Sequence, residues 1–139
     1  MRPTTRLAMW GLAALFLWPG VALADVGSWA GSYTSAEGDT MLSVTRTGKR
    51  TGTAAVTIGN YCSYECKVKE SGGKLILTFV SQDGRCAPLR RGKKVATLKV
   101  LDREICETCP EGRGDNIRIT KIRLIAHRGE ISDTVVERN

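Results

Sequence analysis

Residues 62–69 read Cys62-Ser63-Tyr64-Glu65-Cys66-Lys67-Val68-Lys69, and this stretch decides the fold class. Apolar side chains and cysteines occupy every second position, and charged or small polar side chains lie between them. A period of two is typical of a β-strand with one buried and one solvent-facing side. We therefore expect Cys62, Tyr64, Cys66 and Val68 to point into a core, and Ser63, Glu65, Lys67 and Lys69 to point outward.

Similar stretches lie on both sides of this strand. Strand candidates cover residues 40–45, 53–58, 75–79, 94–101 and 115–128, and turns such as Gly59-Asn60 and Ser71-Gly72-Gly73 separate them. Val, Ile and Thr dominate these stretches, which favours strands over helices. The sequence predicts an all-β fold, a small antiparallel β-barrel or sandwich of about seven or eight strands, stabilised by disulfides.

The alternation also predicts which side chains form the core and where it breaks. The expected core residues are Trp29, Leu42, Val44, Leu75, Leu77, Phe79, Leu98 and Leu124. Ile117 and Ile119 are out of phase with Ile122, so a β-bulge near Thr120 is needed to turn all three inward.

Two further predictions concern the strand over residues 94–101 and the end of the chain. In residues 94–101, strict alternation places Val95 and Thr97 on the face opposite Ala96 and Leu98. Residues 133–139 end the chain, and we expect them to form a frayed tail because terminal residues are poorly ordered unless something holds them.

The first 24 residues have the pattern of a signal peptide. Arg2 and Arg6 precede an apolar run over residues 7–18, Pro19-Gly20 ends it, and residues 21–24 have the small-x-small pattern of a cleavage site. The run is shorter than the roughly 20 residues that a membrane-spanning helix needs. We expect cleavage after Ala24 rather than an uncleaved anchor, leaving residues 25–139 as a single secreted or periplasmic β domain with no transmembrane span.

Length and charge exclude several classes of protein. The chain has 139 residues, too few for a two-domain enzyme or for a (β/α)₈ barrel of about 250 residues. It carries 21 basic and 14 acidic residues, and loss of Arg2 and Arg6 with the leader lowers its formal charge from +7 to +5. A basic exported domain favours an anionic partner.

The densest run of basic residues spans residues 85–94 and contains no acid. The anion-binding candidates are Arg85, Arg90, Arg91, Lys93 and Lys94. Gly84 and Gly92 mark this run as a loop. Its function is either to bind an anionic group or only to keep the protein in solution. Nucleic acid is not expected as a partner, because the protein is exported and no aromatic side chain interleaves the run to stack on bases.

All five cysteines follow the leader: Cys62, Cys66, Cys86, Cys106 and Cys109. Disulfides form and persist in exported proteins. On one strand, Cys62 and Cys66 would lie about 13 Å apart at ~3.3 Å per residue, beyond the roughly 7 Å that a bridge allows. We therefore expect two bridges from this strand to two of the three later cysteines, with the fifth cysteine free or used between chains.

Neither a metal site nor a catalytic site is expected. Cys106 and Cys109 have the spacing of metal ligands, but no second C-x-x-C accompanies them. The single histidine, His127, lies at a strand end, and the chain has no Gly-x-Ser-x-Gly motif for a nucleophilic serine. The sequence therefore predicts a non-catalytic protein without a cofactor.

A short motif near the expected mature N-terminus resembles known secreted barrels. The stretch reads Gly27-Ser28-Trp29-Ala30-Gly31-Ser32-Tyr33. Its Gly-x-Trp at the start of the first strand resembles the opening of lipocalin-like barrels, and its Trp-x-Gly-x-Tyr resembles small bacterial barrels of the lysozyme-inhibitor type. The resemblance implies a closed or half-closed barrel with Trp29 packed at its floor.

Three functions follow from these observations. The favoured one is an exported binding protein of the cell envelope or secretome that recognises an anionic envelope component or an acidic protein. The alternative is an inhibitor of an envelope-directed hydrolase such as lysozyme. The charge of the chain argues against this alternative, because animal-type lysozymes are also basic and two basic proteins repel each other. A small secreted enzyme is the third. The oligomeric state is not indicated.

Export can be tested directly. We expect N-terminal sequencing of the periplasmic or secreted protein to read Asp-Val-Gly-Ser-Trp, because signal peptidase cuts after Ala24. A mature protein that still begins with Met1 would contradict the prediction and weaken the argument for disulfides.

Overall fold

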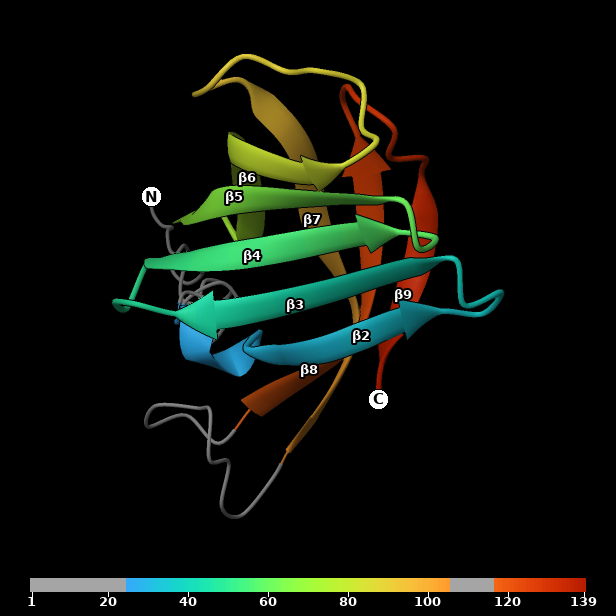
Figure 1. Cartoon of the computed structure of the whole chain (residues 1–139). Coiled ribbons are helices and arrows are strands. Elements are labelled where there is room, and N and C mark those ends of the chain that lie inside the picture. Colours follow the sequence, from blue (N-terminus) through green and yellow to red (C-terminus); the bar gives the residue numbers. More distant parts are fainter. Residues whose placement is uncertain (1–24, 106–116) are drawn as a thin grey trace, which may run out of the picture.

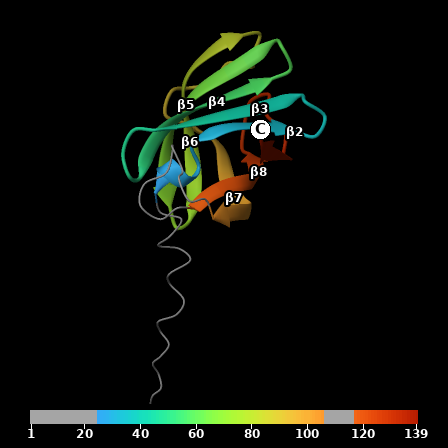
Figure 2. The same cartoon turned by 90° about the horizontal axis from the view of Figure 1, so that it is seen from below.

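The computed structural model describes residues 25–105 and 117–139 and shows a closed antiparallel β-barrel. After a short 3-10 turn, η3 (Val26–Ser28), the strands are β2 (Gly31–Ser35), β3 (Thr40–Arg46), β4 (Thr51–Ile58), β5 (Cys62–Ser71), β6 (Lys74–Gly84), β7 (Lys94–Ile105), β8 (Ile117–Ala126) and β9 (Thr134–Arg138). Each strand pairs with the next, and β9 also pairs with β2 (Figures 1 and 2). The predicted all-β class is confirmed, and the sheet forms a barrel rather than a sandwich.

Strand β5 has the alternation that its sequence predicts. Its four inward side chains, Cys62, Tyr64, Cys66 and Val68, are each at most 3% exposed. The register of the neighbouring strands extends this pattern, because Cys66 faces Ala54 on β4 and Phe79 on β6. Paired residues point to the same side of a sheet, so one period-two stretch aligns the inward sides of three strands.

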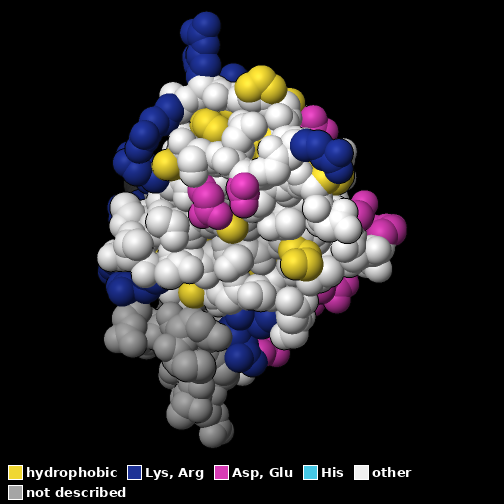
Figure 3. All heavy atoms as spheres, in the orientation of Figure 1, with side chains coloured by type: hydrophobic (Ala, Val, Ile, Leu, Met, Phe, Trp, Pro, Cys, Tyr) yellow, Lys and Arg dark blue, Asp and Glu magenta, His cyan; other side chains and the backbone are white. Residues whose placement is uncertain are grey.

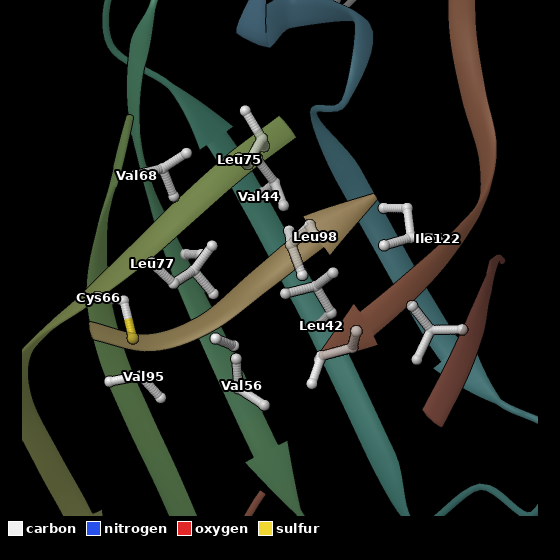
Figure 4. Packing of buried hydrophobic residues seen from close by; sticks show 14 of the residues in the cluster. Leu42, Val44, Val56, Cys66, Val68, Leu75, Leu77, Val95, Leu98 and Ile122 are labelled. Atoms are coloured by element: carbon white, nitrogen blue, oxygen red, sulfur yellow. The ribbon is translucent and has the colours of Figure 1, made fainter. Parts of the chain in front are cut away.

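The interior of the barrel is filled by side chains from the surrounding strands (Figure 4). All eight predicted core residues are buried. Trp29, Tyr33 and Tyr64 are the largest of the fully buried side chains. Because large aromatic side chains from different strands occupy the interior, the barrel has a packed core.

β-Bulges explain where the alternation fails in β7 and β8. Ile119 and Ile122 are both fully buried although three positions separate them, and the pairing of β7 with β8 skips Thr120. The predicted bulge is therefore confirmed. The predicted outward position of Val95 is wrong: the register between β6 and β7 shifts beside it, and the extra residue turns Val95 into the core.

The predicted frayed C-terminus is also wrong. Strand β9 lies between β8 and β2 and closes the barrel, with Val136 fully buried. Arg138 holds this closure: its guanidinium donates to the carbonyls of Ile119 and Ala30, at 2.8 and 2.9 Å, and to the hydroxyl of Tyr33 at 2.9 Å. The guanidinium also lies 5.0 Å from the centre of the Tyr33 ring, a cation–π distance.

The turn η3 covers one end of the barrel. Asp25 caps it, accepting from the backbone N–H of Gly27 at 2.7 Å and from Arg46 Nε at 3.0 Å. The N–H of Val26 donates to Lys49 O in the β3–β4 turn, which fixes η3 over the end of the sheet. Trp29 follows η3 and is fully buried there. Within the described ranges, no helix has the length and hydrophobicity to cross a bilayer.

Arg138 provides a test of the closure. In Arg138→Met the apolar stem remains, but two carbonyls and one hydroxyl lose a charged donor, so we expect the free energy of unfolding to fall by about 2–4 kcal/mol. The matched control is Arg123→Met on the exposed face of β8, which should change it by no more than about 0.5 kcal/mol. Equal effects in chemical denaturation would contradict the role of Arg138.

Candidate anion-binding site

Of the predicted basic loop, residues 85–94, the structure shows residues 85–93 as the connection between β6 and β7, since Lys94 begins β7. This connection lies at the end of the barrel opposite η3 and is tied to the sheet at both of its ends. A disulfide joins Cys86 to Cys62 on β5, with their Cα atoms 5.0 Å apart. At the other end, the N–H of Gly92 donates to Phe79 O at 2.9 Å, and the N–H of Phe79 donates to Lys93 O at 2.8 Å. The basic side chains between these anchors therefore start from a fixed backbone.

The hydroxyl of Tyr64 joins this loop to residues 127–133, which connect β8 with β9. It donates to Ala87 O at 3.0 Å and accepts from the N–H of Glu130 at 3.1 Å. Burial raises the pKa of Tyr64 above its ordinary value, so the hydroxyl keeps its proton at neutral pH. Gly129 makes the approach possible, because a Cβ there would lie 2.8 Å from Tyr64 Oη. One buried side chain thus sets the distance between two loops.

Where the two loops meet, they border an open hollow of about 420 Å³, which we call the basic hollow. It is lined by Pro88, Leu89, Arg90, Lys93 and Arg128. Arg90, Lys93 and Arg128 form no ion pair within the described part of the chain. Three cations around one hollow make it electropositive, which favours an anion.

Only some of the five predicted anion-binding residues line the basic hollow. Arg90 and Lys93 line the basic hollow, whereas Arg85 and Arg91 do not. Lys94 begins β7 and is exposed on the outer face of the barrel. Sequence reasoning missed Arg128, which is far from this run in the chain. The order of the strands is the signal that could have found it. In an antiparallel meander every second connection lies at the same end of the barrel, so the β6–β7 and β8–β9 connections are neighbours in space.

The cysteines only partly follow their prediction. The Cys62–Cys86 bridge agrees with it, but the expected second bridge from Cys66 is wrong, since Cys66 is a free, buried thiol. Cys66 sits between Ala54 and Phe79 in the middle of the barrel wall, away from the loops. Burial, assisted by the charge of Glu65, raises the pKa of the Cys66 thiol to about 12, so it is protonated at neutral pH. Cys106 and Cys109 lie outside the described residues.

His127 has a local structural contact. Its Nε2 lies 2.8 Å from the hydroxyl of Thr97 on β7, and its backbone N–H donates to Val95 O at 2.9 Å. These contacts hold the start of the connection that carries Arg128. Among residues 25–105 and 117–139, no cluster of three or more His, Cys, Asp or Glu side chains is placed to hold a metal ion. The chemistry that the described site offers is electrostatic binding.

Comparison with protein-family models, with curated proteins and with solved structures finds no match to this chain. The resemblance of Gly27-Ser28-Trp29 to lipocalin-like barrels therefore stays a prediction. Trp29 differs slightly from its expected place, because it follows a 3-10 turn and the first strand begins two residues later, at Gly31.

The hydroxyl of Tyr64 can be removed without changing the packing volume of the ring. In Tyr64→Phe we expect faster trypsin cleavage within residues 85–93 and a free energy of unfolding lower by about 1–3 kcal/mol, because Ala87 O and the N–H of Glu130 lose their shared partner. Tyr61→Phe, at a partly exposed ring in the β4–β5 turn, is the control. If both variants resist trypsin as well as the parent protein, Tyr64 does not position the loop.

Proposed function

We propose that this protein is an exported, non-catalytic binding barrel whose basic hollow binds an anionic component of the cell envelope. The observation that carries the proposal is the meeting of Arg90 and Lys93 from one loop with Arg128 from another around a single hollow. Like charges brought together repel one another, and a bound anion relieves this repulsion. Such an arrangement is therefore best explained by a ligand of opposite charge.

The side chains of the hollow suit phosphate, sulfate or carboxylate groups. Guanidinium groups such as those of Arg90 and Arg128 bind these oxyanions through paired hydrogen bonds, and the Lys93 ammonium adds a mobile point charge. The backbone is held before any ligand arrives, by the Cys62–Cys86 disulfide and by Tyr64 Oη. A preorganised loop loses little conformational entropy on binding, which favours affinity.

Two features support export. The Cys62–Cys86 disulfide is of a kind that persists in oxidising compartments such as the periplasm or the extracellular space. Asp25, the first residue after the predicted cleavage site, caps η3 and pairs with Arg46, so the expected cut would leave the fold complete. We also propose that the domain is a lipocalin-like barrel, on the strength of its closed sheet and of Trp29 buried beside η3.

The test is to neutralise the basic hollow and measure binding to anionic surfaces. In Arg90→Ser/Lys93→Ser/Arg128→Ser, we expect affinity for heparin beads and for vesicles containing phosphatidylglycerol to fall about tenfold or more, since three charge contacts are lost. Binding should also weaken as salt is added, because salt screens exposed charges.

The matched control removes the same charge elsewhere. Arg85→Ser/Arg91→Ser/Arg123→Ser takes away three exposed cations that do not line the hollow, and it should bind much as the parent protein does. Equal losses in the two triple variants would show that net charge, and not the hollow, causes binding. Circular dichroism of both variants checks that the barrel is intact.

A further inference from the structure

A second and larger concavity lies on the outer face of the barrel. It has a volume of about 610 Å³ and crosses strands β4, β5 and β6, and we call it the lysine groove. Its lining includes Thr51, Thr53, Lys67, Lys69, Ile76 and Thr78. No acidic side chain lines it. No residue lines both the lysine groove and the basic hollow, so the two are separate.

Strand register explains the chemistry of the lysine groove. Lys67 pairs with Thr53 on one side and Thr78 on the other, and Lys69 pairs in the same way with Thr51 and Ile76. Each lysine therefore stands between side chains that present methyl groups. The floor of the groove is apolar, and the two ammonium groups reach water above it on their aliphatic stems.

An exposed lysine connects the lysine groove with the loop of the basic hollow. Thr78 pairs with Lys94 on β7, so Lys67 and Lys94 lie on the same face, two strands or about 10 Å apart. Lys94 directly follows Lys93, which lines the hollow. Figure 3 shows Lys and Arg side chains along the left and upper margins of the face formed by β2 to β5, and others at the right and below, while acidic and hydrophobic side chains interrupt its middle. Positive charge thus continues from the hollow around the wall of the barrel.

We propose that the lysine groove is a second subsite for the ligand of the basic hollow, and that this ligand is a linear acidic polysaccharide. The inference rests on the proposed function and deepens it. Sugar rings have apolar C–H faces that fit a floor of methyl groups, and their carboxylate or sulfate groups repeat along the chain to meet successive cations. A single headgroup would fill the hollow alone and leave Lys67 and Lys69 unused.

An outward-facing acid marks one border of the lysine groove. Glu65 points outward on β5, two positions before Lys67, and pairs with Ser81. It does not line the groove. An anionic chain is therefore repelled from the middle of the β5 strand and directed across β6 towards Lys94.

The experiment compares a short and a long probe of the same chemistry. We expect the parent protein to bind a full-length heparin chain more tightly than a heparin disaccharide. In Lys67→Ser/Lys69→Ser, affinity for the long chain should fall about fivefold to tenfold, while affinity for the disaccharide stays unchanged. The matched control, Lys99→Ser/Arg123→Ser, removes two exposed cations that face each other on β7 and β8 and should leave both affinities as they were.

The outcomes separate this inference from the proposed function. One outcome is that affinity for the disaccharide requires the basic hollow, while affinity for the long chain does not change in Lys67→Ser/Lys69→Ser. The hollow then remains a binding site, and the second subsite is excluded. If inorganic polyphosphate shows the same dependence on Lys67 and Lys69 as heparin, the assignment of a sugar chain is overturned. If the lysine variant instead loses only self-association in sedimentation, the groove binds a second copy. Failure of the parent protein to bind either heparin probe overturns both proposals.

Discussion

Closure of the sheet by β9 is the constraint on which the rest of this structure depends. A sheet of eight strands with open edges would expose unpaired backbone groups on both sides, whereas the pairing of β9 with β8 and β2 leaves no edge. Arg138 acts at this junction, since it contacts carbonyls before β2 and on β8 together with the ring and hydroxyl of Tyr33. One charged side chain thus ties the last strand to β8, to Tyr33 on the first strand and to Ala30 just before that strand.

The candidate site is a product of the same closure. Because the strands form a meander around the barrel, residues 85–93 and 127–133 emerge at the same end, although they connect different strand pairs. Tyr64 of β5 lies inside the barrel, and its hydroxyl hydrogen-bonds to both loops, which fixes the distance between them. Core packing and the geometry of the candidate site therefore meet in one side chain, which belongs to the hydrophobic cluster through its ring and contacts the loops through its oxygen.

Sequence patterns predict the strands well and the contacts between distant segments poorly, for a physical reason. In β5 one side faces solvent and the other faces the core. Each residue's own polarity therefore indicates the side on which it lies. The position of β9 depends instead on what remains unpaired after the other strands have formed, and Val135-Val136 is too short a stretch to indicate it. For the same reason the sequence does not single out Arg128 and wrongly predicts a bridge for Cys66, because the neighbours of both residues follow from the three-dimensional arrangement.

Closure by the last strand also determines when this chain is able to fold. Tyr33 pairs with Arg138, so the contact that completes the barrel joins the two ends of the domain, and its formation must overcome the entropy of closing a very long loop. The other strand pairs join neighbours along the chain, so we expect this distant pairing to be the slowest to form. The barrel is therefore complete only after the residues of β9 have been synthesised, even if the other strands pair earlier.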